Sequence, residues 1–140
     1  MYYFLEITGK PFVKQRPQVN NATGNVFTPQ KTLNYETRVS NLFQIKYPNH
    51  KLLTGAISVC FFLFMPIPKS ASKKKREEML SFSELPTTKK DLSNMIKVLE
   101  DGLNLVAYHD DGQICDIYTI KRYSDRPRAV IILKEKQINA

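Results

Sequence analysis

Carboxylate side chains are concentrated in one short part of this chain, between residues 91 and 116. Six of the thirteen acidic residues lie there, although the chain carries 21 lysines and arginines and a net charge of +8. A surface that binds phosphate normally avoids carboxylates, unless a hard divalent cation lies between the two negative groups. Mg²⁺ prefers oxygen ligands and often uses a few carboxylates together with phosphate oxygens of the substrate. We therefore predict that Asp91, Asp110 and Asp111 converge on a Mg²⁺ ion.

A lysine accompanies these carboxylates on a predicted helix over Ser93–Leu103. At roughly 100° per residue, Lys97 lies opposite the leucine-rich stripe of this helix. It stands about one turn inside the helix, within reach of a group bound by Asp91. A lysine beside a metal site can orient an attacking water or offset the charge that develops on phosphate. The pattern indicates metal-assisted hydrolysis of a phosphodiester.

Each of these residues also has a purely structural interpretation. Asp91 or Ser93 can cap the helix, because both residue types favour that position. The segment DDG at 110–112 can form an ordinary turn. Lys97 can pair with Asp101, four residues later, on the helix surface. These alternatives stay open at the level of sequence.

The charge balance predicts a polyanionic partner. A net charge of +8 and an isoelectric point near 9.5 favour nucleic acid first and an anionic membrane surface second. Charge that serves only solubility is the alternative. The longest apolar run, Ala56–Ile67, is shorter than the ~20 residues of a membrane span, and the N-terminus lacks signal-peptide features. We expect an intracellular protein with a single domain over residues 1–140 and no membrane partner.

Strand and helix patterns follow one another without repeats. Four segments predict strands: Tyr2–Thr8, Ala56–Met65 (buried on both faces), Ile114–Tyr123 and Arg128–Lys134, the last two joined by a turn at 124–127. Helices are predicted from a Thr28-Pro29 start to Tyr47, over a short charged segment at 69–78, and over Ser93–Leu103. A turn cluster occupies Asn20–Asn25. We predict an α+β fold in which a small mixed sheet packs with helices.

An ordered set of motifs resembles the RusA family of Holliday-junction resolvases. The set comprises KDLSNMIK at 90–97, DGLN at 101–104, DDGQI at 110–114 and KRY at 121–123. Upstream segments look like the N-terminal half of the family: GKP at 9–11, RP at 16–17, TP at 28–29, YE at 35–36 followed by Val39, and SKKKR at 72–76. The resemblance covers nearly the whole chain.

The resemblance implies a homodimeric, Mg²⁺-dependent endonuclease of phage or prophage origin that acts in the bacterial cytoplasm. Such enzymes cut two strands of a four-way junction symmetrically. Asp91 and Asp111 match metal-binding aspartates, Asp110 matches the neighbouring acid, and Lys97 matches the catalytic lysine. Positions that we expect to shape the site are matched by Asn94 and Asp101.

Two positions depart from the family pattern. Ser93 stands where the family has a metal-binding aspartate, so a bound cation has a neutral oxygen in place of a charged ligand and should bind less tightly. Lys90 stands where the family has proline. Three explanations compete: an active variant that uses Asp110 or Glu100 instead, a homologue that binds junctions without cutting, and an engineered inactive form.

Candidate phosphate contacts are spread along the chain, and each can equally be part of a solvated basic face. They are Lys14, Arg16, Lys73, Lys74, Lys75, Arg76, Lys121, Arg122, Arg126 and Arg128. The sequence has no base-reading motif, which favours recognition of DNA shape. The leading hypothesis is junction cleavage, and the second is junction binding with weak or no cleavage. A basic phage regulatory protein that binds nucleic acid through charge alone is the third.

Overall fold

The chain folds into two units whose segments alternate along the sequence. The computed structural model describes residues 1–87 and 91–136. The sheet unit comprises Met1–Pro11, Leu53–Lys90 and Gly112–Ala140, and the helix unit comprises Phe12–Leu52 and Asp91–Asp111. Lys90, at the family's proline position, lies outside the described residues. The single domain expected over residues 1–140 stays a prediction.

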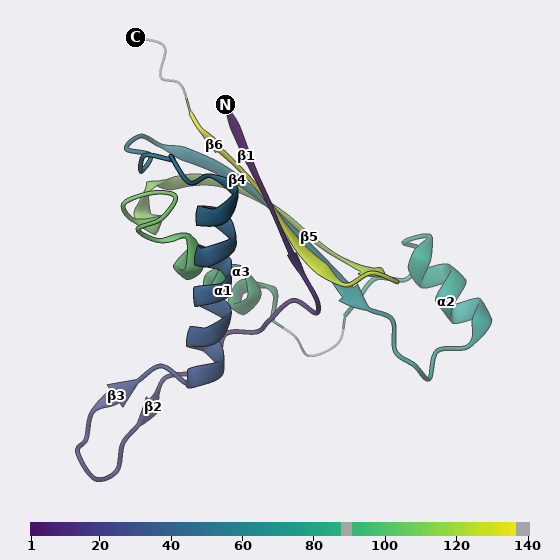
Figure 1. The fold of residues 1–140 in the computed structure, drawn as a ribbon. Coiled ribbons are helices and arrows are strands. Elements are labelled where there is room, and N and C mark those ends of the chain that lie inside the picture. Colours follow the sequence, from purple (N-terminus) through teal and green to yellow (C-terminus); the bar gives the residue numbers. More distant parts are fainter. Residues whose placement is uncertain (88–90, 137–140) are drawn as a thin grey trace. The chain divides into compact units, whose positions relative to one another are not determined.

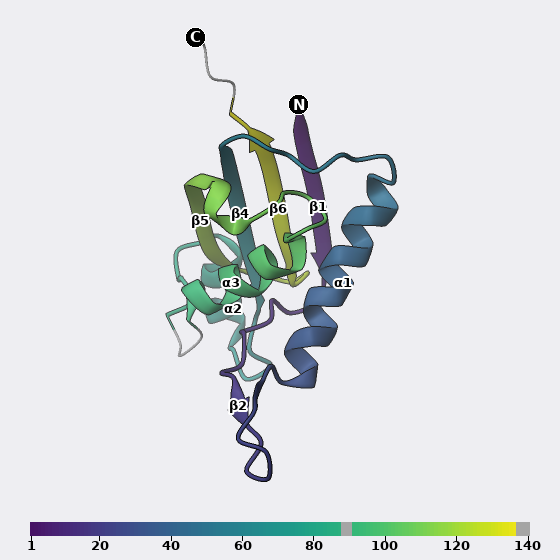
Figure 2. The same ribbon diagram turned by 90° about the vertical axis from the view of Figure 1, so that its left-hand side faces the viewer.

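Four strands form the mixed sheet that the sequence predicts. They are β1 (Tyr2–Thr8), β4 (Ile57–Pro66), β5 (Ile114–Ser124) and β6 (Arg128–Glu135). Figure 2 shows them side by side in the order β1-β6-β4-β5. β6 runs antiparallel to both of its neighbours, whereas β4 and β5 are parallel. The short connection after Ser124 joins β5 to β6 as expected, but the two strands do not pair, because β4 lies between them.

One face of β4 is buried and the other is half exposed, so the prediction of burial on both faces was wrong. Ile57, Phe61 and Leu63 have no exposed surface, and Val59 and Met65 are also buried. The alternating residues are only partly buried along the whole strand. Alternate side chains of a strand point to opposite faces of the sheet. The apolar run therefore supplies one core face and one face with accessible aromatic rings.

Two helices pack against each other in the helix unit. They are α1 (Gln30–Lys46) and α3 (Leu92–Leu103), and Figure 1 shows both. The buried side of α3 includes Met95, Leu99 and Leu103, as its 3.6-residue periodicity predicts. The start of α1 differs by one residue from the expectation, because Pro29 and not Thr28 is the N-cap and no side chain caps the helix.

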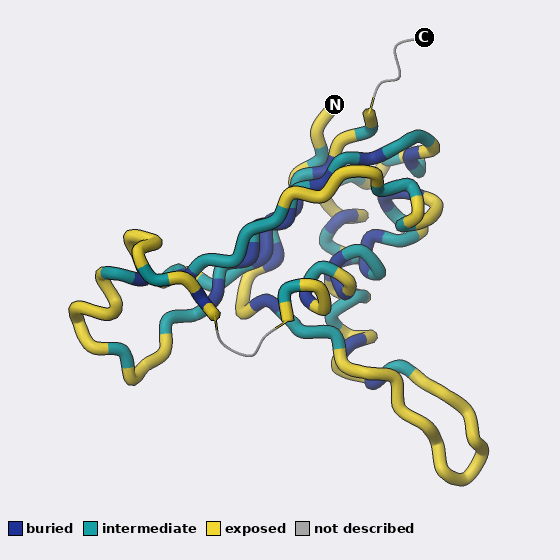
Figure 3. Tube along the Cα trace, turned by 180° about the vertical axis from the view of Figure 1, so that it is seen from behind, coloured by how far each residue is buried: buried dark blue, intermediate teal, exposed yellow. Residues whose placement is uncertain are grey.

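Two smaller elements complete the fold. A hairpin of β2 (Gln18–Val19) and β3 (Val26–Phe27) encloses the predicted turn cluster, and Figure 3 shows it as an exposed loop. Helix α2 (Lys73–Leu80) begins later than the charged segment suggested, since the Ser72 hydroxyl oxygen caps it by accepting from the Lys75 N–H. Within the described residues, no helix has the length and apolar character needed to cross a membrane.

Gly102 sets the close approach of α3 to α1. A Cβ atom at this position would lie 2.7 Å from Val39 Cβ and 3.0 Å from the Glu36 carbonyl oxygen, closer than packed atoms tolerate. We expect Gly102→Ala to lower the free energy of unfolding by about 1–2 kcal/mol, because overpacking outweighs the gain in helix propensity. Chemical denaturation measures this change. Asn41→Ala, at an exposed position of α1, is the control, and a Gly102→Ala protein as stable as this control would contradict the packing argument.

Candidate active site

The start of α3 is organised around Asp91. Asp91 is the N-cap residue, and its Oδ1 accepts a 2.9 Å hydrogen bond from the Ser93 N–H. Its Oδ2 accepts a 3.4 Å hydrogen bond from Asn94 Nδ2. The capping interpretation of Asp91 is therefore confirmed. Both Ser93 and Asn94 serve to hold this carboxylate at the helix start, which fits the site-shaping role expected of Asn94.

Lys97 lies between two carboxylates of the predicted site. Its Nζ donates to Asp111 Oδ2 at 2.7 Å and lies 3.3 Å from Asp101 Oδ1. The surface pair with Asp101 is thus present, and Asp111 joins it from a different segment. The Lys97 ammonium is therefore shared by Asp101, on the same helix, and Asp111, which lies fourteen positions after Lys97 in the chain.

A tight return of the chain after α3 brings Asp111 back to the helix. Leu105 adopts a left-handed backbone with φ of 66°, and its N–H donates to the Tyr108 carbonyl oxygen at 2.8 Å. The fully buried Tyr108 anchors the return, because its hydroxyl donates to the Glu100 carbonyl oxygen at 2.7 Å. A left-handed conformation is costly for leucine, so the anchored loop must offset it. This arrangement places Asp110 and Asp111 beside α3.

Lys14 extends the ion-pair network toward α1. Its Nζ donates to Asp101 Oδ2 and lies 3.9 Å from Glu36 Oε1. The backbone holds this lysine in place, since the Lys14 N–H donates to the Asn94 carbonyl oxygen at 3.2 Å. Acidic and basic groups therefore alternate from Glu36 through Lys14, Asp101 and Lys97 to Asp111. We call these five residues, with Glu100 and Asp110, the acidic cluster.

The contacts within the acidic cluster keep both Lys97 and Asp111 charged at neutral pH. The hydrogen bond to Asp111 raises the pKa of Lys97, with further support from Asp101. The same hydrogen bond lowers the pKa of Asp111. Lys97 therefore remains an ammonium group at neutral pH and is unsuited to act as a general base. It is suited to hold a positive charge at a fixed point.

Excess negative charge surrounds this pair. Burial raises the pKa of Glu100. The Lys97 ammonium opposes this shift, whereas the charges of Asp111 and Asp101 add to it. Burial also raises the pKa of Tyr108, followed by the charges of Glu100, Asp111, Asp101 and Asp110. The cluster holds five carboxylates against two ammonium groups, in a protein whose overall charge is positive.

The Lys97–Asp111 pair should contribute to stability over a wide pH window. Asp111 has a folded-state pKa below its usual 3.8, so its contribution is present above that value and is lost as pH falls through the lowered pKa. Lys97 has a folded-state pKa above 10.5, so its contribution is present below that value and is lost as pH rises further. We expect the stability difference between wild type and Asp111→Asn to be constant from about pH 5 to pH 9 and to shrink in acid. Urea denaturation across this range measures it, and a difference that changes near neutral pH would contradict the assignment.

The residues of this region fit a hard divalent cation by donor type. Asp91, Asp110 and Asp111 offer carboxylate oxygens, and Ser93 offers a neutral one. Within residues 1–87 and 91–136, no group of three acidic, histidine or cysteine side chains is gathered closely enough to hold a metal. Mg²⁺ commonly keeps several waters and binds through one or two carboxylates plus substrate phosphate. A cation here would therefore depend on water and phosphate for most of its ligands.

The predicted phosphate contacts are distributed over both units. Lys73, Lys74, Lys75 and Arg76 form the first half of α2, where Lys75 pairs with Glu78 and Glu84. Arg126 pairs with Glu6 at 3.1 Å, and Arg128 stacks over the Phe64 ring at 4.0 Å. Arg16 is exposed in the helix unit, and Lys121 and Arg122 lie on β5. Contacts of these residues with DNA stay predictions. The Lys14 ammonium group already forms ion pairs with Asp101 and Glu36.

Glu36 is the member of the cluster that sequence reasoning missed. Its contact with Lys14 joins residues that are separated by the hairpin and the start of α1. No local spacing signals such a contact. Its place beside Tyr35, in the YE segment at 35–36 that resembles the family pattern, was the signal that could have found it.

Comparisons with known proteins agree with the ordered motifs. A family model described as endodeoxyribonuclease RusA matches residues 8–134. An uncharacterized protein of Bacillus subtilis strain 168, YqaN, is 32% identical over 133 residues, which cover 92% of this chain and 93% of the relative. The matched range contains the whole acidic cluster, Asp91 and all of the predicted phosphate contacts.

Proposed function

Because the chain belongs to the RusA family of endodeoxyribonucleases, whose substrates are branched DNA junctions, we propose that it resolves four-way junctions by paired, symmetric nicks with Mg²⁺ as cofactor. The observation that carries this proposal is the position of Lys97. Its ammonium group lies against Asp111 and Asp101, on the helix whose start Asp91 caps. A fixed cation among carboxylates suits transfer of a phosphoryl group, where negative charge develops on oxygen.

The proposed division of roles follows the contacts of each side chain. Asp91, Asp110 and Asp111 would offer carboxylate oxygens to Mg²⁺, with Ser93 as a neutral neighbour, and water and DNA phosphate would supply most of the other ligands. Bound Mg²⁺ supplies a more acidic water and neutralises phosphate charge. Lys97 keeps its proton and stabilises the charge of the pentacoordinate phosphate. Asn94 and Asp101 are positioning residues, since Asn94 holds Asp91 and Asp101 holds Lys97.

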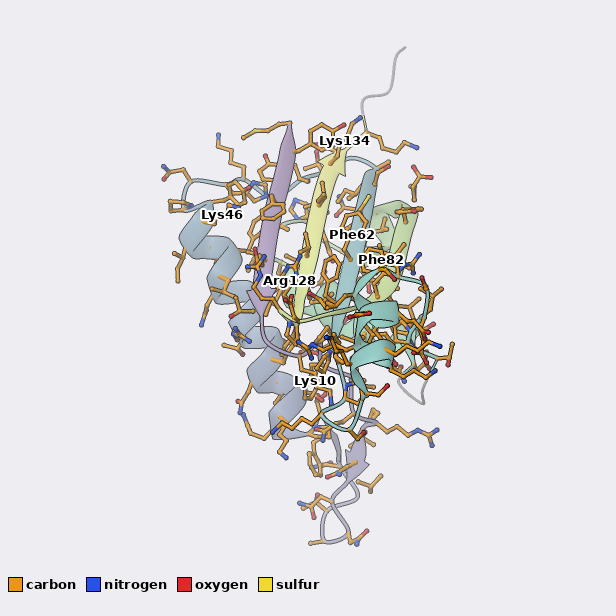
Figure 4. All side chains as sticks on the ribbon, turned by 90° about the vertical axis from the view of Figure 1, so that its right-hand side faces the viewer. Lys10, Lys46, Phe62, Phe82, Arg128 and Lys134 are labelled. Carbon is orange, nitrogen blue, oxygen red and sulfur yellow. The ribbon has the colours of Figure 1, made fainter. Side chains whose placement is uncertain are left out.

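The proposed partner is a second copy of the chain in addition to the branched DNA. A symmetric pair of nicks requires two active sites, and residues 1–87 and 91–136 contain one acidic cluster. The half-exposed face of the sheet offers a surface for such a copy. Phe62 lies on this face, as Figure 4 shows, and Tyr118 on the neighbouring strand is 62% exposed. Light scattering at micromolar protein should give twice the mass of the chain. We place the protein in the cytoplasm of a bacterial cell, encoded by a phage or prophage.

A second candidate function is junction binding with little or no cleavage. Ser93 favours it, because the missing carboxylate leaves one less charged ligand near Asp91 and weakens cation binding. The two candidates share the DNA partner and differ only in chemistry. A Ser93→Asp variant separates them.

The experiment that tests the proposed function compares a synthetic four-way junction with a linear duplex of the same sequence. We expect the junction to be nicked in Mg²⁺, to stay intact in EDTA, and to be cut at least about tenfold faster than the duplex. Equal cutting of junction and duplex would contradict the structure-selective part of the proposal. Binding of the junction without any nick, at all Mg²⁺ concentrations, would favour the second candidate.

A further inference from the structure

A pocket of about 400 Å³ lies in the sheet unit, at the ends of β4 and β5. Because these strands are parallel, their C-terminal ends meet at the same edge, where Met65 pairs with Tyr123. Lys10, just after β1, and Lys69, in the segment after β4, complete the rim with Lys121. Figure 4 shows Lys10 near the end of the sheet where Arg128 lies.

The lining of the pocket combines positive charge with apolar surface. The described lining includes Lys10, Lys69 and Lys121, and none of the described residues that line the pocket is acidic. The apolar part of the lining comes from Met65, Ile67, Tyr123 and three prolines. Met65 and Tyr123 are almost fully buried, so the accessible apolar surface belongs to Pro66, Ile67 and Pro68. An anionic ligand with a flat, apolar part matches both properties. Lysines on flexible stems suit phosphate as point charges, and the apolar surface beside them suits the flat face of a base.

We propose that this pocket binds one unstacked nucleotide of a DNA strand, with its phosphate at the lysine rim and its base against the apolar surface of Pro66, Ile67 and Pro68. The volume lies at the low end of the range of small-ligand pockets, which is about 300–1,000 Å³, so it admits a single nucleotide and not a duplex. Strands at a branch point expose unstacked bases more readily than a continuous duplex does. The inference rests on the proposed DNA substrate, but it does not require cleavage.

Methyl NMR locates the binding directly, because the chain has only four methionines. We would label the methionine methyl groups with ¹³C and titrate the full chain with thymidine 5′-monophosphate. Met65 lines the pocket, whereas Met95 is buried in the helix unit. We expect the Met65 signal to shift with saturation and the Met95 signal to stay in place. A Met65 signal that does not move, or that moves equally with inorganic phosphate, overturns the proposal.

A charge reversal tests the same pocket with single-stranded DNA. Lys69→Glu should weaken binding of an oligothymidine of eight nucleotides by about tenfold. Lys51→Glu makes the same charge change at an exposed position outside the pocket and should change this affinity little. An abasic oligomer of equal length should bind wild type about tenfold more weakly than oligothymidine, since it lacks the stacked base. Equal losses in the two variants, or equal affinity for the two oligomers, contradict the proposal. If the pocket behaves as expected and the junction is never cut, the proposed nuclease function fails and the pocket stands.

Discussion

Replacing Lys97 with methionine is expected to lower the single-turnover rate of junction cleavage by about 10²–10³-fold. Lys97 holds its ammonium group 2.7 Å from Asp111 and 3.3 Å from Asp101, and its raised pKa keeps it charged at neutral pH. Methionine fills a similar volume without the charge. The loss therefore reports on the stabilisation of charge in the transition state.

The affinity of the junction separates this effect from a loss of DNA binding. Lys97→Met should bind the junction within a few-fold of wild type, because one exposed lysine contributes little to total phosphate contact. Lys31→Met, at an exposed position of α1, is the matched control and should cut normally. A Lys97→Met protein that keeps more than about a tenth of the wild-type rate would contradict the role assigned to Lys97.

The second large effect is expected from restoring a carboxylate at position 93. We expect Ser93→Asp to lower the Mg²⁺ concentration for half-maximal cleavage by about tenfold, because ligand charge governs affinity for hard cations. The added charge lies in the first turn of α3, where the helix dipole favours it. Repulsion from Asp91 opposes it until a cation is bound. Mg²⁺ should therefore raise the melting temperature of Ser93→Asp more than that of wild type.

Ser93→Asn distinguishes charge from shape. Asparagine has the size of aspartate but no negative charge, so it should leave the Mg²⁺ requirement near that of wild type. If wild type and Ser93→Asp reach half-maximal cleavage at the same Mg²⁺ concentration, the serine does not limit cation binding. If Ser93→Asp gains at least about tenfold in rate at unchanged junction affinity, the natural chain is chiefly a junction-binding protein.

Much of the fold could be predicted from local patterns. The aromatic and β-branched residues of β1 and β4 and the leucine stripe of α3 gave elements that agree with the structure to within about two residues. The spatial neighbour of β5 could not be predicted, because the order of strands depends on contacts between distant segments. The β2–β3 hairpin was missed because two paired residues per strand are too few to leave a periodic pattern.

The aspartates and Lys97 of the candidate site could be predicted from the sequence, but Glu36, the role of Lys14 and the connections between the residues could not. Lys97 and Asp101 share a helix face, so their pairing follows from spacing. The contact of Lys14 with Asp101 joins residues 87 positions apart, and nothing local in the sequence indicates it. The capping role of Asp91 and its proposed metal-binding role draw on the same carboxylate, which explains why the structural and functional interpretations were hard to separate.

Strand-resolved cleavage tests the central claim most directly. A four-way junction labelled on each strand in turn would be incubated with Mg²⁺ and either wild type or Asp111→Asn, and the nicks mapped at nucleotide resolution. We predict two nicks at symmetric positions on opposing strands with wild type, and none with Asp111→Asn at equal junction binding. Nicks that are absent with wild type, asymmetric, or undiminished in Asp111→Asn would contradict the assignment of the acidic cluster as the catalytic centre of a junction-resolving nuclease.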